Sequence, residues 1–402
     1  MDTKVANLSL KRSLRRQLDD KNESLLIDIF VRSESSSLIL NGDFVWFQLF
    51  IEVVLRMTDH EKGKQELIDR SLEEYKDDAL EKQKINDFAK NYTSSDAIKW
   101  YTRDSFVYRM INKALRQQDV DTLYAFRILI IDIHRQLKNL HEQKRSTESI
   151  LHFYRGQFLS RKELDQFQQN IGNFISMKSF LSTSVDRQVA MIFTGERIGL
   201  CSVLFDLRVD AQLNGTKPFA DITSLSYYED EEEVLFMLGT IFRIDQVLFN
   251  SEANCWIIEL DLSSDDHTEL KATFDSLNEN IDDETNLYEL GRIFWNMKNL
   301  DAAERCFNKL IQQTHSNINV IPGCYLHLGN IASDRGQYDK AVEFHRRSLE
   351  LKQQILPEDH PYLPYSHNSL GEVLRLCGNF DEALLHYKKA LSLWQRQYGN
   401  DE

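Results

Sequence analysis

The sequence predicts an α+β domain that follows a mostly helical region and precedes an all-α repeat array. Three observations support this prediction. Residues up to about 145 form charged amphipathic segments with helical spacing. Residues 150–262 contain short apolar runs rich in β-branched and aromatic residues, typical of strands interrupted by helices. From about residue 284 the chain repeats itself.

The N-terminal region, residues 1–90, is expected to be mostly helical, and the sequence assigns it no role. Apolar runs at 24–31 and 36–40 are compatible with short strands. The most apolar window, residues 44–55, is too short to span a bilayer.

Two longer helices are expected next, each with a candidate cap. Ser95 or Asp96 can cap the first helix, and Asp119 or Asp121 can cap the second. An apolar stripe follows each cap: Ile98, Tyr101, Val107, Tyr108, Ile111 and Leu115 on the first, and Leu123, Phe126, Ile130, Ile133 and Leu137 on the second.

The central region is expected to supply the sheet. Its candidate strands are ILHFYRG (150–156), KSFLSTS (178–184), LCSVLFDLRV (200–209), EEVLFML (232–238), TIFRIDQVLF (240–249) and CWIIELDL (255–262). Ser160 with Glu163, and Thr183 with Asp186, have the spacing of capping boxes ahead of two short helices.

The C-terminal region, residues 284–402, contains three copies of one unit that align without gaps. Gly291, Gly329 and Gly371 occupy one position of the unit and follow each other at spacings of 38 and 42 residues. Each copy reads as two antiparallel helices, and the whole resembles the tetratricopeptide repeat. Such an array leaves a concave groove for a protein or peptide partner. The alternative is an unrelated helical bundle.

Charge and cysteine content limit the functional classes. The net charge of −15 argues against nucleic acid as a partner, because phosphates would be repelled. The five cysteines are scattered and form no CxxC pair, so neither a disulfide framework nor a metal site is expected. The N-terminus has no apolar signal core. We expect a cytoplasmic protein without a membrane segment.

An acidic run at 229–233 stands directly before an apolar strand. If that strand includes the acids, Glu231 and Glu233 share one face. Two carboxylates placed in this way can have different catalytic roles, since one can stabilise a cation while the other accepts a proton. The alternative is an acidic loop that only keeps the strand soluble.

Two further motifs carry polar groups at strands. Arg155 lies inside an apolar strand, where it can pair with an acid or grip a phosphate, and Gly156 would let a ligand approach the backbone. Ser182, Thr183 and Ser184 end another strand. Their hydroxyls can cap a helix, bind a ribose or hold a neighbouring carboxylate.

The order of arginine, Ser-Thr-Ser and Glu-x-Glu resembles the arginine-specific mono-ADP-ribosyltransferases of the R-S-E class. The resemblance covers about residues 95–262 and implies a mixed β-sandwich with a preceding helical lobe, within a transferase domain bounded at 91–265. It implies a glycosyltransferase-type enzyme that uses NAD⁺ as substrate and modifies arginine-bearing target proteins. The repeats at 284–402 would recruit those targets.

The resemblance also assigns roles to matching residues. Arg155 would bind the NAD⁺ pyrophosphate, and Ser182 would steady Glu233 and the nicotinamide ribose. Glu233 would stabilise the oxocarbenium-like transition state, and Glu231 would deprotonate the incoming guanidinium. Tyr228 would contact the target protein. Two other functions stay open: a catalytically inactive NAD-binding scaffold and an NAD glycohydrolase.

Overall fold

The computed structural model describes residues 27–30, 42–58, 60–143, 149–195, 197–228, 232–264, 287–296, 298–313 and 320–398. The chain divides into two compact units, Met1–Asp282 and Asp283–Glu402. The predicted run at 36–40 and most of the acidic run lie outside the described residues.

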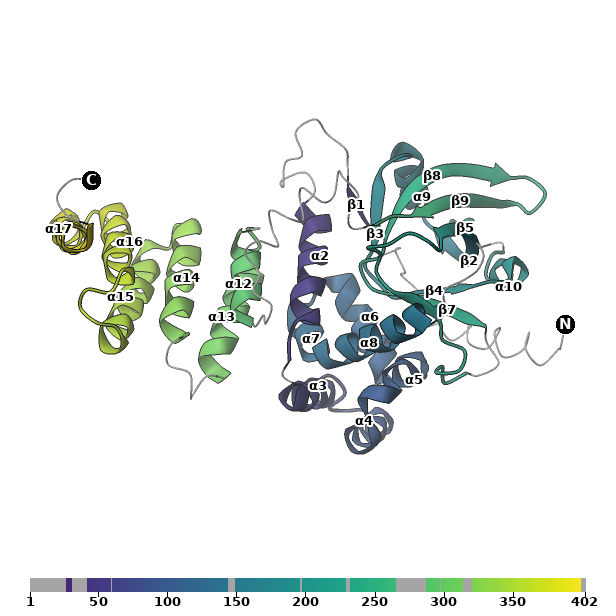
Figure 1. The fold of residues 1–402 in the computed structure, drawn as a ribbon, viewed down its shortest axis with the longest axis horizontal. Coiled ribbons are helices and arrows are strands. Elements are labelled where there is room, and N and C mark those ends of the chain that lie inside the picture. The colour runs from purple at the N-terminus through teal and green to yellow at the C-terminus, as the bar shows by residue number, and fades with distance from the viewer. Residues whose placement is uncertain are drawn as a thin grey trace. The chain divides into compact units, whose positions relative to one another are not determined.

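The first unit begins with a strand and a group of helices. These elements are β1 (Ile27–Phe30), α2 (Gly42–Leu55), α3 (His60–Glu74), α4 (Ala79–Asn91), a 3₁₀ turn (Ser94–Asp96), α5 (Ala97–Thr102), α6 (Phe106–Gln117), α7 (Val120–Ala125) and α8 (Arg127–Gln143). Figure 1 shows α2–α8 gathered on one side of the strands. The apolar window at 44–55 is therefore helical and packs inside this unit.

The two long helices expected after Ser95 and Asp119 are each divided. The first breaks into α5 and α6 where Arg103 adopts an extended conformation, directly after Thr102, whose Oγ1 donates to the carbonyls of Ile98 and Lys99. The second breaks into α7 and α8 at Phe126. The Asp119 cap is confirmed, since its side chain accepts from the Thr122 amide, whereas Asp96 makes no side-chain cap.

The sheet is built from strands far apart in the sequence. After β1 come β2 (Ile150–Leu159), β3 (Phe174–Met177), β4 (Leu181–Ser184), β5 (Cys201–Asp210), β6 (Phe219–Asp221), β7 (Glu233–Phe236), β8 (Ile241–Asn250) and β9 (Cys255–Leu262). In the described residues they form one mixed sheet in the order β1-β3-β8-β9-β5-β2-β4-β7-β6. The pair β5–β9 is parallel and the other pairs are antiparallel.

One strand pairing in this sheet, between β2 and β4, is short, and the candidate site lies beside it. Strand β2 pairs with β5 along its whole length but with β4 only through Tyr154 and Ser184. Large apolar side chains from both sides of this pairing, including Phe153, Phe205 and Phe236, fill a common core. The expected α+β fold with a preceding helical lobe is confirmed, and its long strands coincide with the predicted apolar runs.

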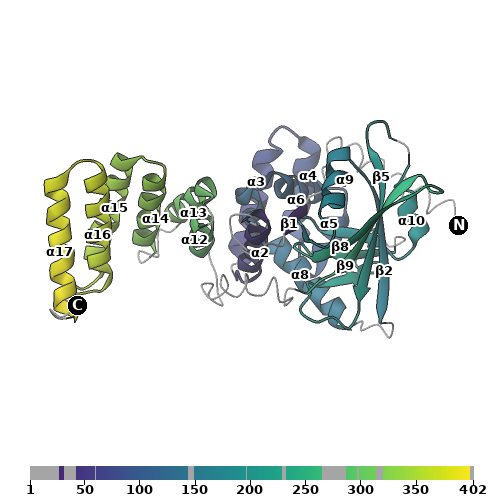
Figure 2. The same cartoon turned by 90° about the horizontal axis from the view of Figure 1, so that it is seen from above.

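Two short helices lie beside the strands. Helix α9 (Arg161–Gln169) begins with the predicted capping box of Ser160 and Glu163. Helix α10 (Arg187–Met191) lies on the side of β2 away from α2–α8 (Figure 2). Its cap is Asp186, which accepts from the Gln188 amide, so the predicted Thr183 cap is wrong.

Helix α2 ties the N-terminal region to the sheet. Gln48 Nε2 donates to Ser176 Oγ at 2.7 Å and to the Gly239 carbonyl at 2.8 Å. Lys217 Nζ forms an ion pair with Glu52 at 2.7 Å. These contacts join residues separated by more than a hundred positions, so α2 packs as part of the first unit.

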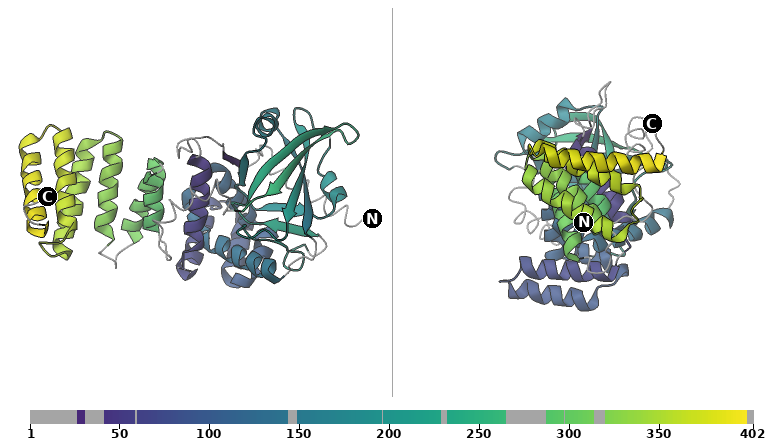
Figure 3. Two further views of the ribbon diagram at one scale, coloured as in Figure 1. Left: turned by 45° about the horizontal axis from the view of Figure 1, so that its top comes forward. Right: turned by 90° about the vertical axis from the view of Figure 1, so that its left-hand side faces the viewer.

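The second unit consists of paired helices (Figure 3). They are α12 (Leu287–Asn296) with α13 (Leu300–Gln313), α14 (Ile321–Asp334) with α15 (Tyr338–Ile355), and α16 (Tyr362–Leu376) with α17 (Phe380–Tyr398). In each pair the repeated glycine faces a ring of the second helix: a Cβ would lie 2.8 Å from Phe307 at Gly291, 2.8 Å from His345 at Gly329 and 2.9 Å from Tyr387 at Gly371. The glycines therefore allow the close approach that each pair needs.

Candidate active site

The site begins with two neighbouring strands, β4 and β7. Their register places Ser184 opposite Glu233 and Ser182 opposite Leu235. Side chains two positions apart on a strand share a face, so Ser182 and Glu233 are diagonal neighbours. Ser182 Oγ donates a hydrogen bond to Glu233 Oε1. The last residue of the acidic run is thereby fixed at the first position of a buried strand.

Strand β2 adds an arginine to this pair. Arg155 Nη1 donates to the Ser182 carbonyl at 3.0 Å, and Arg155 Nε donates to Gln157 Oε1 at 2.9 Å. The structure therefore brings Arg155, Ser182 and Glu233 into one hydrogen-bonded chain. Gln157 was missed by the sequence interpretation, although its position two residues after Arg155 places it on the same face of β2.

Within this chain of contacts, the positive charge of Arg155 has no acidic partner among the described residues. Glu233 is 4% exposed, whereas Arg155 is half-buried. No carboxylate in the described part of the chain pairs with Arg155, and the two oxygens that accept its hydrogen bonds are both neutral. A partly desolvated cation without an acidic partner favours an anionic ligand, and the guanidinium fork suits phosphate oxygens.

The other predicted cofactor-binding residues make contacts within the scaffold. A Cβ on Gly156 would lie 2.0 Å from the Ala190 carbonyl, Thr183 Oγ1 donates to the Val234 carbonyl at 2.9 Å, and Ser184 Oγ accepts from the Asp186 amide at 3.0 Å. Gly156 is thus required by the packing of α10 against β2. The Thr183 hydroxyl holds β4 against β7, and the Ser184 hydroxyl stabilises the turn into α10.

The loop between β6 and β7 carries the predicted target-binding residue. Tyr228 is half-buried and its amide donates to Ser226 Oγ at 3.2 Å. Its neighbour Tyr227 is 47% exposed, and the two rings lie 5.2 Å apart. Glu231 lies outside the described residues, as do Glu229 and Asp230. Strand β7 starts at Glu233, so the predicted shared face of Glu231 and Glu233 is not described.

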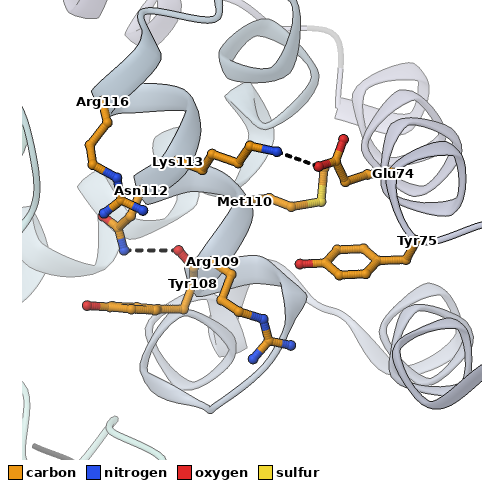
Figure 4. Close-up of a pocket in the computed structure, with 8 residues that line it drawn as sticks. All are labelled: Glu74, Tyr75, Tyr108, Arg109, Met110, Asn112, Lys113 and Arg116. Atoms are coloured by element: carbon orange, nitrogen blue, oxygen red, sulfur yellow. Dashed lines mark hydrogen bonds and ion pairs between the residues drawn. The ribbon is translucent and has the colours of Figure 1, made fainter. Parts of the chain in front are cut away.

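A pocket of about 210 Å³ lies elsewhere in the first unit, between α3 and α6 (Figure 4). Two of its basic groups already have acidic partners. Lys113 Nζ lies 2.6 Å from Glu74 Oε1, and Arg109 Nη2 lies 2.6 Å from Glu81 Oε1. Its lining shares no residue with the Arg155–Ser182–Glu233 chain. The pocket therefore contributes nothing to the predicted chemistry.

Two further properties concern the described part of the chain. No group of three His, Cys, Asp or Glu side chains there could hold a metal ion. No helix there is long and apolar enough to cross a membrane.

Each of the following solved structures is similar to one of the two units. HopU1 of Pseudomonas syringae pv. Tomato DC3000, an ADP-ribosyltransferase, is 16% identical over 52% of this chain and 99% of its own, with a TM-score of 0.36. The C3 exoenzyme of Clostridium limosum is 18% identical over 49% of this chain and 94% of its own, with a TM-score of 0.32.

The repeat unit has structural neighbours of its own. BtubC from P. vanneervenii is 21% identical over 28% of this chain, with a TM-score of 0.26, and the chain spans 46% of the length of BtubC. No curated protein matches the chain.

Sequence models of two families match this chain. Tetratricopeptide repeat models match residues 285–313 and 323–396, within the second unit. The model of the ADP-ribosyltransferase exoenzyme family matches residues 77–279, which include the strands of the site and most of the helical lobe. The chain therefore belongs to the ADP-ribosyltransferase exoenzyme family and carries tetratricopeptide repeats in its C-terminal part.

Proposed function

We propose that this protein is a mono-ADP-ribosyltransferase that transfers ADP-ribose from NAD⁺ to arginine side chains of target proteins and releases nicotinamide. The observation that carries the proposal is the hydrogen-bonded chain from Arg155 through Ser182 to Glu233, inside a domain of this family. In this arrangement the Arg155 guanidinium can bind the phosphates of the substrate. The Glu233 carboxylate can stabilise the positive charge that forms on the sugar.

Arg155 binds the pyrophosphate of NAD⁺ in this proposal. Its bonds to the Ser182 carbonyl and to Gln157 fix the plane of the guanidinium while leaving its charge uncompensated among the described residues. A planar, preoriented fork loses less entropy when it binds two phosphate oxygens than a free side chain would. The same contact with the Ser182 carbonyl connects substrate binding to the catalytic strand.

Glu233 stabilises the transition state. Cleavage of the bond between nicotinamide and ribose leaves positive charge on the sugar carbon, and a fixed carboxylate lowers the energy of that charge. The bonding electrons leave with the nicotinamide, which departs as a neutral molecule. Burial of Glu233 and the hydrogen bond from Ser182 hold the carboxylate in one orientation before the reaction starts.

Glu231 acts on the acceptor in this proposal. A protonated guanidinium is a poor nucleophile, so the attacking nitrogen must lose a proton as it bonds to the sugar carbon. A carboxylate two residues before Glu233 can accept that proton. If water attacks instead, the enzyme is an NAD glycohydrolase, so Glu231 decides between transfer and hydrolysis.

The two other parts of the chain receive supporting roles. Helices α2–α4 complete the helical lobe of the transferase, in agreement with the contacts of Gln48 with Ser176 and Gly239. The repeats at 284–402 recruit the protein target in their groove. No disulfide joins the five cysteines, all of which lie in the described part of the chain, and this suits a reducing compartment such as the cytoplasm.

The proposal is tested with labelled NAD⁺ and arginine methyl ester, scoring nicotinamide release and adduct formation separately. We expect Glu231→Gln to keep NAD⁺ hydrolysis and lose the arginine adduct, and Glu233→Ala to lose both. Release without any adduct by the wild type would identify a glycohydrolase. Absence of both activities, together with NAD⁺ binding in a calorimetric titration, would identify an inactive scaffold.

A further inference from the structure

A buried amide of helix α2 contacts two segments of the sheet. Gln48 lies within an apolar stretch of the sequence, residues 44–51, and is 2% exposed. Its Nε2 donates to Ser176 Oγ at 2.7 Å and to the Gly239 carbonyl at 2.8 Å, so both hydrogens of this nitrogen are used. Because a buried amide is costly unless it is hydrogen-bonded, these two bonds fix where the three segments lie relative to one another.

The two partners of Gln48 belong to the connections of the strands that form the candidate site. Ser176 lies in β3, and the chain runs from β3 into β4, which carries Ser182. Gly239 lies in the turn between β7, which starts at Glu233, and β8. One amide group therefore joins the segment that leads to Ser182 and the segment that follows Glu233.

Backbone hydrogen bonds join the same two segments. The Gly239 amide donates to the Met177 carbonyl at 2.9 Å, and the Met177 amide donates to the Thr240 carbonyl at 3.0 Å. Gly239 has a φ of +77°, and a Cβ there would lie 3.1 Å from Gln48 Oε1. The turn therefore needs a glycine both for its conformation and for its close approach to α2.

An ion pair holds the connection from β3 to β4 a second time. Lys178 directly follows β3, and its Nζ lies 2.6 Å from Asp28 Oδ1 in β1, with both residues buried. Figure 1 shows β1 beside β3. Strand β1 and helix α2 both precede residue 77, where the match to the ADP-ribosyltransferase exoenzyme model begins. The N-terminal region thus supplies two independent contacts to the segment that leads to Ser182.

We propose that Gln48 is a positioning residue for Ser182 and Glu233, which makes α2 a necessary part of the transferase. The inference rests on the proposed function. The Ser182 hydroxyl reaches the Glu233 carboxylate only while β4 and β7 keep their places, and a small displacement of that carboxylate weakens its effect on the transition state. Arg155 lies on β2, which pairs with β5 along its whole length, so its position does not depend on Gln48.

The kinetic test compares nicotinamide release by the wild type and by Gln48→Met, whose unbranched side chain has a similar length and donates no hydrogen bond. We expect kcat to fall about 10-fold or more, because Glu233 is no longer held in its orientation. The KM for NAD⁺ should stay within about twofold, since Arg155 keeps its place on β2. An unchanged kcat in Gln48→Met would overturn the inference.

The matched control is Tyr92→Phe, which also removes buried hydrogen bonding from the first unit. The Tyr92 hydroxyl donates to Asp132 Oδ2 at 2.7 Å, and this bond joins the end of α4 to α8 without reaching a strand. The variant should lose a similar amount of stability in urea denaturation and keep the wild-type kcat. An equal fall in kcat in Gln48→Met and Tyr92→Phe would contradict a positioning role.

A double variant separates positioning of the carboxylate from a general loosening of the sheet. If Gln48 acts by keeping Glu233 beside Ser182, its loss matters less once the Ser182 hydroxyl is gone. Gln48→Met should therefore lower kcat by no more than about threefold in a Ser182→Ala background, against about 10-fold or more in the wild-type background. Equal fold-changes in the two backgrounds would overturn the inference.

A further measurement does not depend on any activity. Hydrogen–deuterium exchange of the Met177 and Gly239 amides should be about 3- to 30-fold faster in Gln48→Met than in the wild type, and unchanged in Tyr92→Phe. Unchanged exchange in Gln48→Met would show that α2 does not hold these segments. If the wild type releases no nicotinamide, the proposed function fails, and the exchange result still decides whether Gln48 holds the two segments.

Discussion

Ser182 makes two contacts that serve different purposes. Its hydroxyl donates to Glu233, and its carbonyl accepts from Arg155. The side chain can be removed without disturbing the backbone contact. A substitution at this position therefore separates the orientation of the carboxylate from the position of the arginine.

Ser182→Ala should lower the kcat for nicotinamide release by about 10- to 100-fold, because Glu233 loses the donor that orients it. The KM for NAD⁺ should change little, since the Arg155 contact is to the backbone. The control Ser160→Ala removes a helix cap and should cost about 1 kcal/mol of stability without changing kcat. An unchanged kcat in Ser182→Ala would show that Glu233 needs no such orientation.

Gly156→Ala should destabilise the first unit by about 2 kcal/mol or more, because the new methyl group meets the backbone carbonyl of Ala190 at 2.0 Å. Urea denaturation measures the free energy of unfolding. Gly195→Ala is the matched control, since a Cβ there meets nothing within 4 Å. Equal stability of the two variants would contradict the packing of α10 against β2.

Some residue positions could be predicted from the sequence and others could not. The cluster of Arg155, Ser182 and Glu233 follows from three motifs that lie within, at the end of and at the beginning of apolar strands. The contact of Thr102 with Tyr227 could not be predicted, because it joins a short helix to a loop across 125 residues and has no local pattern. The functional roles of the clustered residues stay predictions.

At the scale of elements, helix caps could be predicted from the sequence where contacts between residues close in sequence determine the conformation. The Ser160–Glu163 capping box is confirmed because both partners lie within one turn. The Thr183 cap is wrong because its hydroxyl bonds to the Val234 carbonyl of the neighbouring strand. Strands β3 and β6 were missed; both are short, and the strands that β3 and β6 pair with lie elsewhere in the sequence.

The repeat helices contain buried histidines whose protonation should weaken the second unit. Burial, followed by the charge of Lys352, lowers the pKa of His345 to about 4 from a usual value near 6.5. Between these two values the unfolded chain binds a proton that the folded chain does not. The stability that the neutral ring provides is therefore complete above about pH 6.5 and is lost as the pH falls towards 4.

We expect the free energy of unfolding of the wild type to fall by about 1–3 kcal/mol per buried histidine between pH 6.5 and 4. His345→Gln should reduce this slope, because glutamine does not titrate. Urea denaturation at several pH values measures the slope for both proteins. Parallel decreases in the two proteins would contradict a role for His345.

At the scale of the whole molecule, the chain has two units with separate cores. The core of the first is formed by residues such as Phe153 and Phe236, and that of the second by residues such as Leu370 and Leu374. The repeats could be predicted because each copy has the same residue pattern. The order of strands in the sheet could not be predicted, because neighbouring strands are far apart in the sequence.

Gly329→Ala should therefore affect the two units differently. The new methyl group would lie 2.8 Å from the His345 ring and should lower the unfolding temperature of the second unit. Scanning calorimetry should show one shifted and one unshifted transition, and nicotinamide release should remain within about twofold of wild type. A common shift of all unfolding signals would contradict the independence of the two units.

The central claim is that Glu233, held by Ser182 beside Arg155, stabilises the cation formed when NAD⁺ loses nicotinamide. The most direct measurement compares nicotinamide release by the wild type and by Glu233→Gln, which keeps the shape of the side chain and removes its charge. We predict a loss of about 100-fold or more in kcat with NAD⁺ binding retained in a calorimetric titration. Turnover by Glu233→Gln at the wild-type rate would contradict the claim.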